Sequence, residues 1–166
     1  LPLVGAALER LGADVASPAR VRRALDAGET AVVFPEGREA VARPYAQAYR
    51  VERFTRVSVL RVAIEAGAPI VPVGLIGVDE VHPVLARLPL PRLFAATGIP
   101  AVPVTPTLVP LPTKWRIRFG APLMPVRPYP RTPRDQFLHE RAEYVRTEVQ
   151  RLLDHERLRR STVIFG

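Results

Sequence analysis

The chain contains 166 residues, of which 48% are hydrophobic, so it is long enough for one compact domain with its own core, which argues against a disordered chain. Its formal net charge of +8 comes almost wholly from arginine, since Lys114 is the only lysine. A basic balance favours phosphorylated substrates, nucleic acid or an anionic membrane as partners, although a GC-rich genome would give the same arginine bias. Cysteine is absent, which excludes disulfides and thiolate chemistry.

The first part of the chain predicts a βαβ unit. Residues 13–16 form a short strand candidate, and Ser17 and Pro18 then have the residue types of an N-cap and a first helical position. Gly28 is the expected C-terminal stop of this helix. Residues 30–34 are continuously apolar, which is typical of a parallel strand with both faces buried.

A polar block follows this strand directly, at Phe34, Pro35, Glu36, Gly37 and Arg38. Glycine lets backbone N–H groups approach a ligand, arginine offers a fork of donors suited to phosphate, and glutamate accepts hydrogen bonds from hydroxyls or orients the arginine. Ligands of parallel sheets gather beyond the carboxyl ends of strands. The block therefore predicts a site for a phosphorylated polyol; the alternative is a turn closed by a surface ion pair.

A second crossover is predicted further on. Residues 56–65 have the apolar pattern of a buried helix that ends at Gly67, and residues 69–76 read as another apolar strand. Pro72 confines that strand to a sheet edge or a bulge. We therefore expect a single α/β domain over residues 1–166, with a mostly parallel sheet flanked by helices, in which Glu36 and Pro72 face one cleft.

The middle of the chain is rich in proline. Residues 93–113 carry no charge, but their prolines break helix geometry, so an extended loop is expected rather than a membrane span. Residues 85–94 mix apolar side chains with arginine, as membrane-surface segments do, although ordinary surface loops have the same composition.

The last part predicts a strand and a long helix. Residues 114–119 alternate between charged and apolar side chains, which indicates a half-buried strand with Trp115, Ile117 and Phe119 on one face. The helix is expected to start near Asp135. Its core-facing stripe consists of Leu138, Ala142, Val145, Val149 and Leu152.

Two sequence blocks carry a resemblance that spans nearly the whole chain: Phe-Pro-Glu-Gly at residues 34–37 and Pro-Ile-Val-Pro-Val at residues 69–73. Together they resemble the glycerolipid acyltransferase superfamily, and in particular its bacterial lysophospholipid (1-acylglycerol-3-phosphate type) branch. Further similar blocks lie at residues 53–54, 63–69, 77–83, 104–106 and 111–120.

The resemblance implies a catalytic His and Asp separated by four residues, with the His as general base on the acceptor hydroxyl. This chain has no such pair, because none of its histidines, His82, His139 and His155, is followed at the fifth position by Asp. We therefore expect no catalytic residue in this chain and interpret it as the C-terminal part of a longer enzyme, truncated at its N-terminus and inactive alone.

The resemblance also implies substrate-binding residues. Glu36 and the adjoining Phe34, Pro35, Gly37 and Arg38 would contact a glycerol-phosphate acceptor, and Pro72 would shape the cleft for the acyl chain and the acceptor. Members that use glycerol phosphates often have Thr-Arg-Ser after the glycine, whereas this chain has Arg-Glu-Ala at residues 38–40. The resemblance therefore leaves two expected kinds of acceptor: a glycerol phosphate such as lysophosphatidic acid, and a non-phosphorylated lipid alcohol such as diacylglycerol.

The implied donor is acyl-CoA or acyl carrier protein, with no other cofactor. Arg43, Arg50 and Arg53 could meet its phosphates, or could serve solubility alone. Asp79, Glu80 and His82 are interpreted as a solvated loop end and not as metal ligands.

The predicted function is acyl transfer to a lipid hydroxyl in phospholipid biosynthesis, at the cytoplasmic face of the membrane and peripheral to it. No nucleic-acid partner is expected, because no aromatic platform accompanies the arginines. A non-catalytic membrane-binding or lipid-binding homologue is the alternative.

Overall fold

The computed structural model of the protein describes residues 17–36, 43–54, 57–89, 101–107, 109–126, 134–160 and 162. The predicted strand at residues 13–16 lies outside these ranges. The helices are α2 (Pro18–Asp26), a 3₁₀ turn η2 (Tyr45–Gln47), α3 (Val57–Glu65) and α5 (Arg134–Leu158). The strands are β1 (Val73–Ile76), β2 (Ala86–Leu88), β3 (Val102–Val104) and β4 (Arg116–Phe119).

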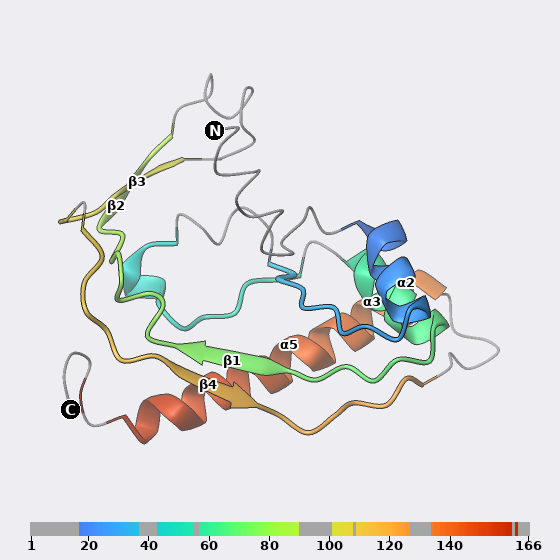
Figure 1. The fold of residues 1–166 in the computed structure, drawn as a ribbon. Coiled ribbons are helices and arrows are strands. Elements are labelled where there is room, and N and C mark those ends of the chain that lie inside the picture. The colour runs from blue at the N-terminus through green and yellow to red at the C-terminus, as the bar shows by residue number, and fades with distance from the viewer. Residues whose placement is uncertain are drawn as a thin grey trace.

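Helices α2 and α3 form at the positions that their sequences predict. The Ser17 hydroxyl accepts a hydrogen bond from the Arg20 backbone N–H at 3.3 Å, and Pro18 occupies the first turn of α2. The two helices pack on each other through a small apolar cluster at one end of the molecule, on the right of Figure 1. Its buried members are Val21, Val59 and Val62.

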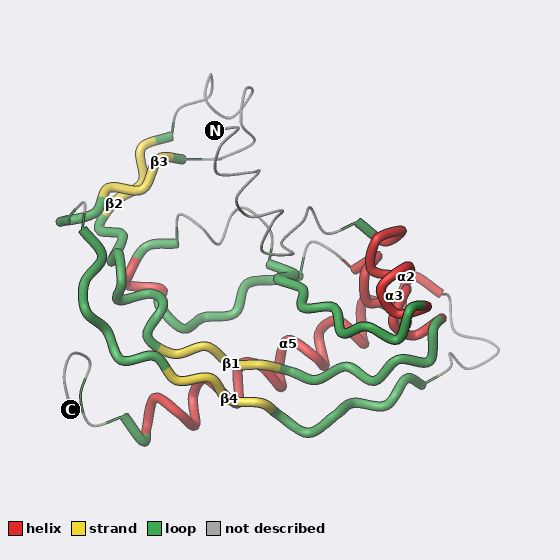
Figure 2. Tube along the Cα trace, viewed as in Figure 1, coloured by secondary structure: helices red, strands yellow, loops and turns green. Residues whose placement is uncertain are grey.

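The sheet differs from the prediction. Strand β1 pairs with β4, β2 pairs with β3, and both pairs are antiparallel. Figure 2 shows the two pairs well apart, with β2–β3 at the far end of the molecule from α2. The mostly parallel sheet is thus not confirmed within the described ranges. Strand β3 lies within residues 93–113, which the sequence predicts to be an extended loop, and β2 lies just before them.

Residues 30–34 were predicted to be a buried parallel strand, and this is wrong for the described chain, in which they are not assigned to a strand. Ala31 and Val33 pack against the α2–α3 cluster, whereas Val32 and Phe34 are 80% and 70% exposed. The segment is therefore covered on one face only. A continuous apolar run does not reveal this, because it is equally compatible with a segment that has one free face.

Strand β4 forms within the range that the sequence predicts, and its arginine face is the one that packs on α5. Its register with β1 places Arg116 and Arg118 opposite Ile76 and Gly74, on the face that α5 covers. Both guanidinium groups there approach the buried carboxylate of Glu156, at 3.7 and 3.8 Å.

The expected apolar face of this strand is the exposed one. Trp115, Ile117 and Phe119 have more than half of their surface accessible. The alternation does not say which face of the strand is buried; here it is the arginine face, because the arginines find a buried acidic partner on α5.

Helix α5 crosses behind β1 and β4 in the view of Figure 1, packs against both strands and extends to α3. Its predicted stripe is confirmed in its main members: Leu138 and Ala142 are buried, and Leu152 lies over Gly74. A second core cluster joins α5 to β1 and to the segment after η2. Its buried members are Tyr49, Ile76 and Leu153.

Candidate functional site

The polar block after residues 30–34 is organised by the carboxylate of Glu36. One carboxylate oxygen accepts a hydrogen bond from the backbone N–H of Glu52 at 2.6 Å, and the other accepts one from Nη2 of Arg43 at 3.0 Å. The Arg43 and Glu36 side chains are 12% and 22% exposed, so this ion pair is largely shielded from solvent. Gly37 and Arg38 lie outside the described residues.

Glu36 and Arg43 together hold the chain that follows η2. Besides its pair with Glu36, Arg43 donates through Nη1 to the carbonyl of Arg50. Glu36 thus forms an ion pair, but with Arg43 and shielded from solvent, whereas the alternative from the sequence was a turn closed by a surface pair.

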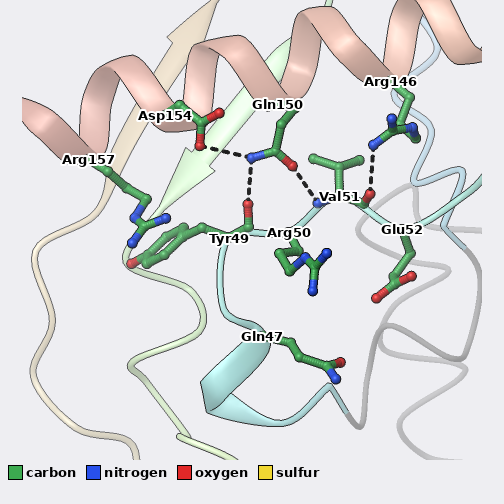
Figure 3. Close-up of a pocket in the computed structure, with 9 residues that line it drawn as sticks. All are labelled: Gln47, Tyr49, Arg50, Val51, Glu52, Arg146, Gln150, Asp154 and Arg157. Atoms are coloured by element: carbon green, nitrogen blue, oxygen red, sulfur yellow. Dashed lines mark hydrogen bonds between the residues drawn. The ribbon is translucent and has the colours of Figure 1, made fainter.

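A pocket of about 530 Å³ adjoins this pair (Figure 3). One wall is the segment from Gln47 to Glu52, and the other is the face of α5 that carries Arg146, Gln150, Asp154 and Arg157. Most of the lining is polar or charged, with Val51 as its one aliphatic member. Such a lining suits a charged, hydrogen-bonding ligand rather than an acyl chain.

Hydrogen bonds fix the wall of the pocket to α5. Figure 3 shows the Gln150 carboxamide between two backbone groups: it accepts from the Val51 N–H and donates to the Tyr49 carbonyl, both at 2.9 Å. Arg146 donates to the Val51 carbonyl at 3.1 Å. The segment is thus bonded to α5 on one side and to Glu36 on the other, so its position depends on both.

The arginines that line the pocket differ in their partners. Arg146 makes a close double hydrogen bond to Glu143, and this guanidinium lowers the pKa of the Glu143 carboxyl below its usual value. Arg157 lies over the Tyr49 ring, 5.3 Å from its centroid. Within the described chain, neither Arg157 nor Arg50 has a carboxylate at ion-pair distance.

A buried polar network lies behind the pocket wall. The Tyr49 hydroxyl donates to Glu80, and Arg160 donates to the same Glu80 oxygen at 2.6 Å. Glu80 is 5% exposed, so the prediction of a solvated loop end at residues 79–82 is wrong for this residue. Burial, followed by the hydrogen bond to Glu80, raises the pKa of the Tyr49 phenol. Asp79 accepts from the Tyr49 backbone N–H at 2.9 Å.

The other predicted residues that the structure describes are Pro72, Phe34 and Pro35. Pro72 is buried, and its carbonyl accepts from the N–H of Gly120 at 2.8 Å, which continues the β1–β4 pairing. Phe34 is exposed and Pro35 is half-buried. The described residues contain no group of His, Asp and Glu side chains arranged to hold a metal ion.

Sequence reasoning missed the residues that build the pocket. Tyr49 adopts a left-handed backbone conformation, with φ at 64°, and no residue pattern indicates this in advance. Gln150 could have been singled out from the sequence, because it is an uncharged polar residue between apolar stripe positions of a predicted core helix. The roles of Arg146 and Arg157 depend on contacts with a segment about a hundred residues earlier, so they needed the structure.

No known family's sequence profile matches the chain. Among curated proteins, uncharacterized proteins of Mycobacterium leprae and Mycobacterium bovis match all of it, with 37% and 36% identity. The chain spans about half the length of these relatives, 47% and 48%.

Among solved structures, the crystal structure of the 1-acyl-sn-glycerophosphate acyltransferase PlsC from Thermotoga maritima matches 89% of this chain and 47% of its own, with a TM-score of 0.55 and 21% sequence identity. At this identity the likeness concerns the fold. The chain thus has the fold of the corresponding half of that acyltransferase.

Proposed function

We propose that the protein carrying this chain transfers a fatty acyl group from acyl-CoA or acyl carrier protein to a lipid hydroxyl, such as that of lysophosphatidic acid. The observation that carries the proposal is the likeness in fold to PlsC over 89% of the chain. It is supported by the Phe-Pro-Glu-Gly block at residues 34–37, whose glutamate is held in place by Arg43 and by the Glu52 backbone.

In this proposal the reaction needs a general base that the chain does not contain, since it has no His and Asp separated by four residues. A histidine from elsewhere in the full-length protein removes the hydroxyl proton as the oxygen attacks the thioester carbonyl. The tetrahedral intermediate then collapses, the C–S bond breaks, and the thiol leaves with a proton. Glu36 and Arg38 hold the acceptor, and this chain alone has no turnover.

The proposed enzyme uses no cofactor besides its acyl thioester, and it acts at the cytoplasmic face of the membrane as a peripheral protein. Net charge and composition support this placement: the formal charge is +8, and apolar side chains accompany arginine at residues 85–88. Among the helices that the structure describes, none is both long and apolar enough to cross a bilayer.

Steady-state kinetics of the full-length protein test the proposal, with Arg38→Ala as the main variant. If Arg38 pairs with the acceptor phosphate, the change raises the acceptor KM by the equivalent of about 1.5–3 kcal/mol and leaves the donor KM nearly unchanged. Arg22→Ala is the control, because Arg22 pairs with Asp26 on the exposed side of α2.

Three results argue against the proposal. Absence of lipid product with any acyl thioester removes the function. An unchanged acceptor KM in Arg38→Ala places the acceptor elsewhere. Equal losses for donor and acceptor, together with a lower melting temperature, mean that Arg38 stabilises a turn.

A further inference from the structure

The pocket between residues 47–52 and α5 combines features of a binding site for a small anion with attached polar groups. Its volume of about 530 Å³ falls in the range of roughly 300–1,000 Å³ that small-molecule sites occupy. Its wall does not depend on a ligand for its position, because Gln150, Arg146, Glu36 and Arg43 already bond that segment. A pocket with a fixed wall loses little conformational freedom on binding.

One arginine of the pocket is bonded to protein groups, and two others have no carboxylate partner in the described chain. Arg146 is occupied by Glu143 and the Val51 carbonyl. Arg50 and Arg157 both line the pocket and, within the described chain, have no carboxylate within 4.0 Å. The Arg157 guanidinium lies over the Tyr49 ring, which restricts its position but leaves its N–H edges available to an anion.

The backbone around Arg50 is restrained by three hydrogen bonds from two side chains. Its neighbours Tyr49 and Val51 are both bonded to Gln150, and its own carbonyl accepts from Arg43. Tyr49 also holds a positive φ of 64°, a conformation that costs a non-glycine residue free energy and persists only where the surrounding contacts impose it. In Figure 3 the Arg50 side chain extends from this restrained point on the side away from α5, between Gln47 and Glu52.

The other lining groups restrict the kind of anion. Glu52 and Asp154 oppose a simple anion, but both accept hydrogen bonds from hydroxyl or amide groups. Gln47 and Gln150 add carboxamides. We propose that this pocket binds a phosphate ester that also carries hydroxyl or amide donors, with Arg50 and Arg157 as its cations at separate positions along the pocket and the acidic and carboxamide side chains on the polar remainder.

Under the proposed function, such a phosphate ester is either the nucleotide part of an acyl-CoA donor or the headgroup of a phosphorylated acceptor. Only this identification of the ligand rests on the proposed function. The Glu36–Arg43 pair joins the pocket wall to the Phe-Pro-Glu-Gly block. A ligand in the pocket would therefore lie next to the block that is proposed to hold the acceptor.

Isothermal titration calorimetry on the full-length protein tests the pocket with adenosine 3′,5′-bisphosphate, glycerol 3-phosphate and inorganic phosphate as separate probes. Binding of the bisphosphate assigns the pocket to the donor, and binding of glycerol 3-phosphate assigns it to the acceptor. In either case we expect Arg50→Gln and Arg157→Gln each to weaken binding by roughly ten- to a hundredfold, as for the loss of a hydrogen bond between charged groups.

Arg151→Gln is the matched control, since Arg151 lies on the same helix, pairs with Glu148 and does not line the pocket. Its affinity should equal that of the unaltered protein. Arg157→Lys keeps the charge and should retain part of the affinity. If Arg157→Gln melts early because its contact with Tyr49 is lost, Arg50→Gln decides the question, since the Arg50 side chain is exposed.

Three outcomes overturn the inference: none of the probes binds, only inorganic phosphate binds, or binding is unchanged in both variants. Calorimetry does not need acyl transfer, so the two proposals fail separately. Binding that depends on Arg50 and Arg157 in a protein without acyltransferase activity overturns the proposed function alone. Acyl transfer by a protein that binds no phosphate ester overturns the pocket alone.

Discussion

Gly77 occupies a backbone position that other residues would not tolerate, directly after β1. Its φ of 102° lies in the region that favours glycine, and a Cβ there would stand 2.5 Å from the carbonyl oxygen of Lys114. Its N–H and carbonyl bond to the Tyr49 hydroxyl and the Thr113 hydroxyl, at 3.3 and 2.9 Å. The contact with another part of the backbone makes this position more demanding than an ordinary turn glycine.

Gly77→Ala should therefore destabilise the protein by more than the left-handed conformation alone costs. Gly28→Ala is the control, since Gly28 also has a positive φ, 75°, but a Cβ there meets nothing within 4 Å. We expect Gly28→Ala to cost about 1–2 kcal/mol and Gly77→Ala clearly more, measured by chemical denaturation. Equal losses would mean that the chain at Lys114 moves aside easily.

Between elements, the network of Tyr49, Glu80 and Arg160 joins the end of α5 to the turn after β1. The Arg160 and Glu80 side chains are only 7% and 6% exposed. The other Glu80 oxygen, Oε2, has no hydrogen-bond partner among the described residues. Arg160 therefore contributes most of the charge compensation that we observe for this carboxylate.

Arg160→Met should cost about 3–5 kcal/mol of unfolding free energy, because it leaves the Glu80 carboxylate buried with no cation beside it. The double variant Glu80→Gln with Arg160→Met removes both charges and should recover a substantial part of that loss. Denaturant titrations of the two single variants and the double variant measure the coupling. Additive losses would show that the pair is not coupled and that the contact is incidental.

The orientation of β4 leads to a second prediction about elements. Ile117 and Phe119 point away from α5 and are exposed, whereas Ile76 on β1 is 1% exposed. Ile117→Thr and Phe119→Thr should each change the stability of the 166-residue chain by about 0.5 kcal/mol or less. Ile76→Thr should cost about 2 kcal/mol or more, since it places a hydroxyl in the core. Large losses at Ile117 and Phe119 would contradict the exposed position of these side chains.

At the scale of the whole molecule, local signals in the sequence predict the helices, whereas the orientation of the strands depends on contacts with distant segments. The cap at Ser17 and the glycines at positions 28 and 67 set the limits of α2 and α3 without reference to other segments. The face of β4 depended on Glu156, which is some forty residues later. Alternation gives two faces to a strand but does not say which is inside when the other face carries arginines that have a buried partner.

In the candidate site, too, one part follows from a local sequence signal and the other depends on contacts between distant segments. The Phe-Pro-Glu-Gly block pointed to Glu36 directly, because its residue types are specific and contiguous. The pocket beside it could not be read from the chain, since its walls come from residues 47–52 and from α5 and meet only in the fold. The left-handed Tyr49 that shapes the wall is held by contacts with Asp79 and Gln150, which no short pattern records.

The net charge of +8 leads to the last prediction, on membrane binding. The protein should bind vesicles containing phosphatidylglycerol, and the binding should weaken between 0.05 and 0.5 M salt, because each cation near an anionic surface contributes about 1 kcal/mol and salt screens this attraction. Leu85, Arg87 and Leu88, around the β2 strand, are all exposed and would form part of the contact.

Co-sedimentation with vesicles measures this binding. The variant Arg87→Glu should reduce it more than Arg22→Glu, which makes the same charge change on α2 at the other end of the molecule (Figure 1). Leu88→Ser should reduce the fraction of binding that persists at high salt, because that fraction depends on apolar contact. Equal losses for the two arginine variants would mean that the charge acts without a defined contact face, and equal binding to neutral phosphatidylcholine vesicles would contradict an electrostatic origin altogether.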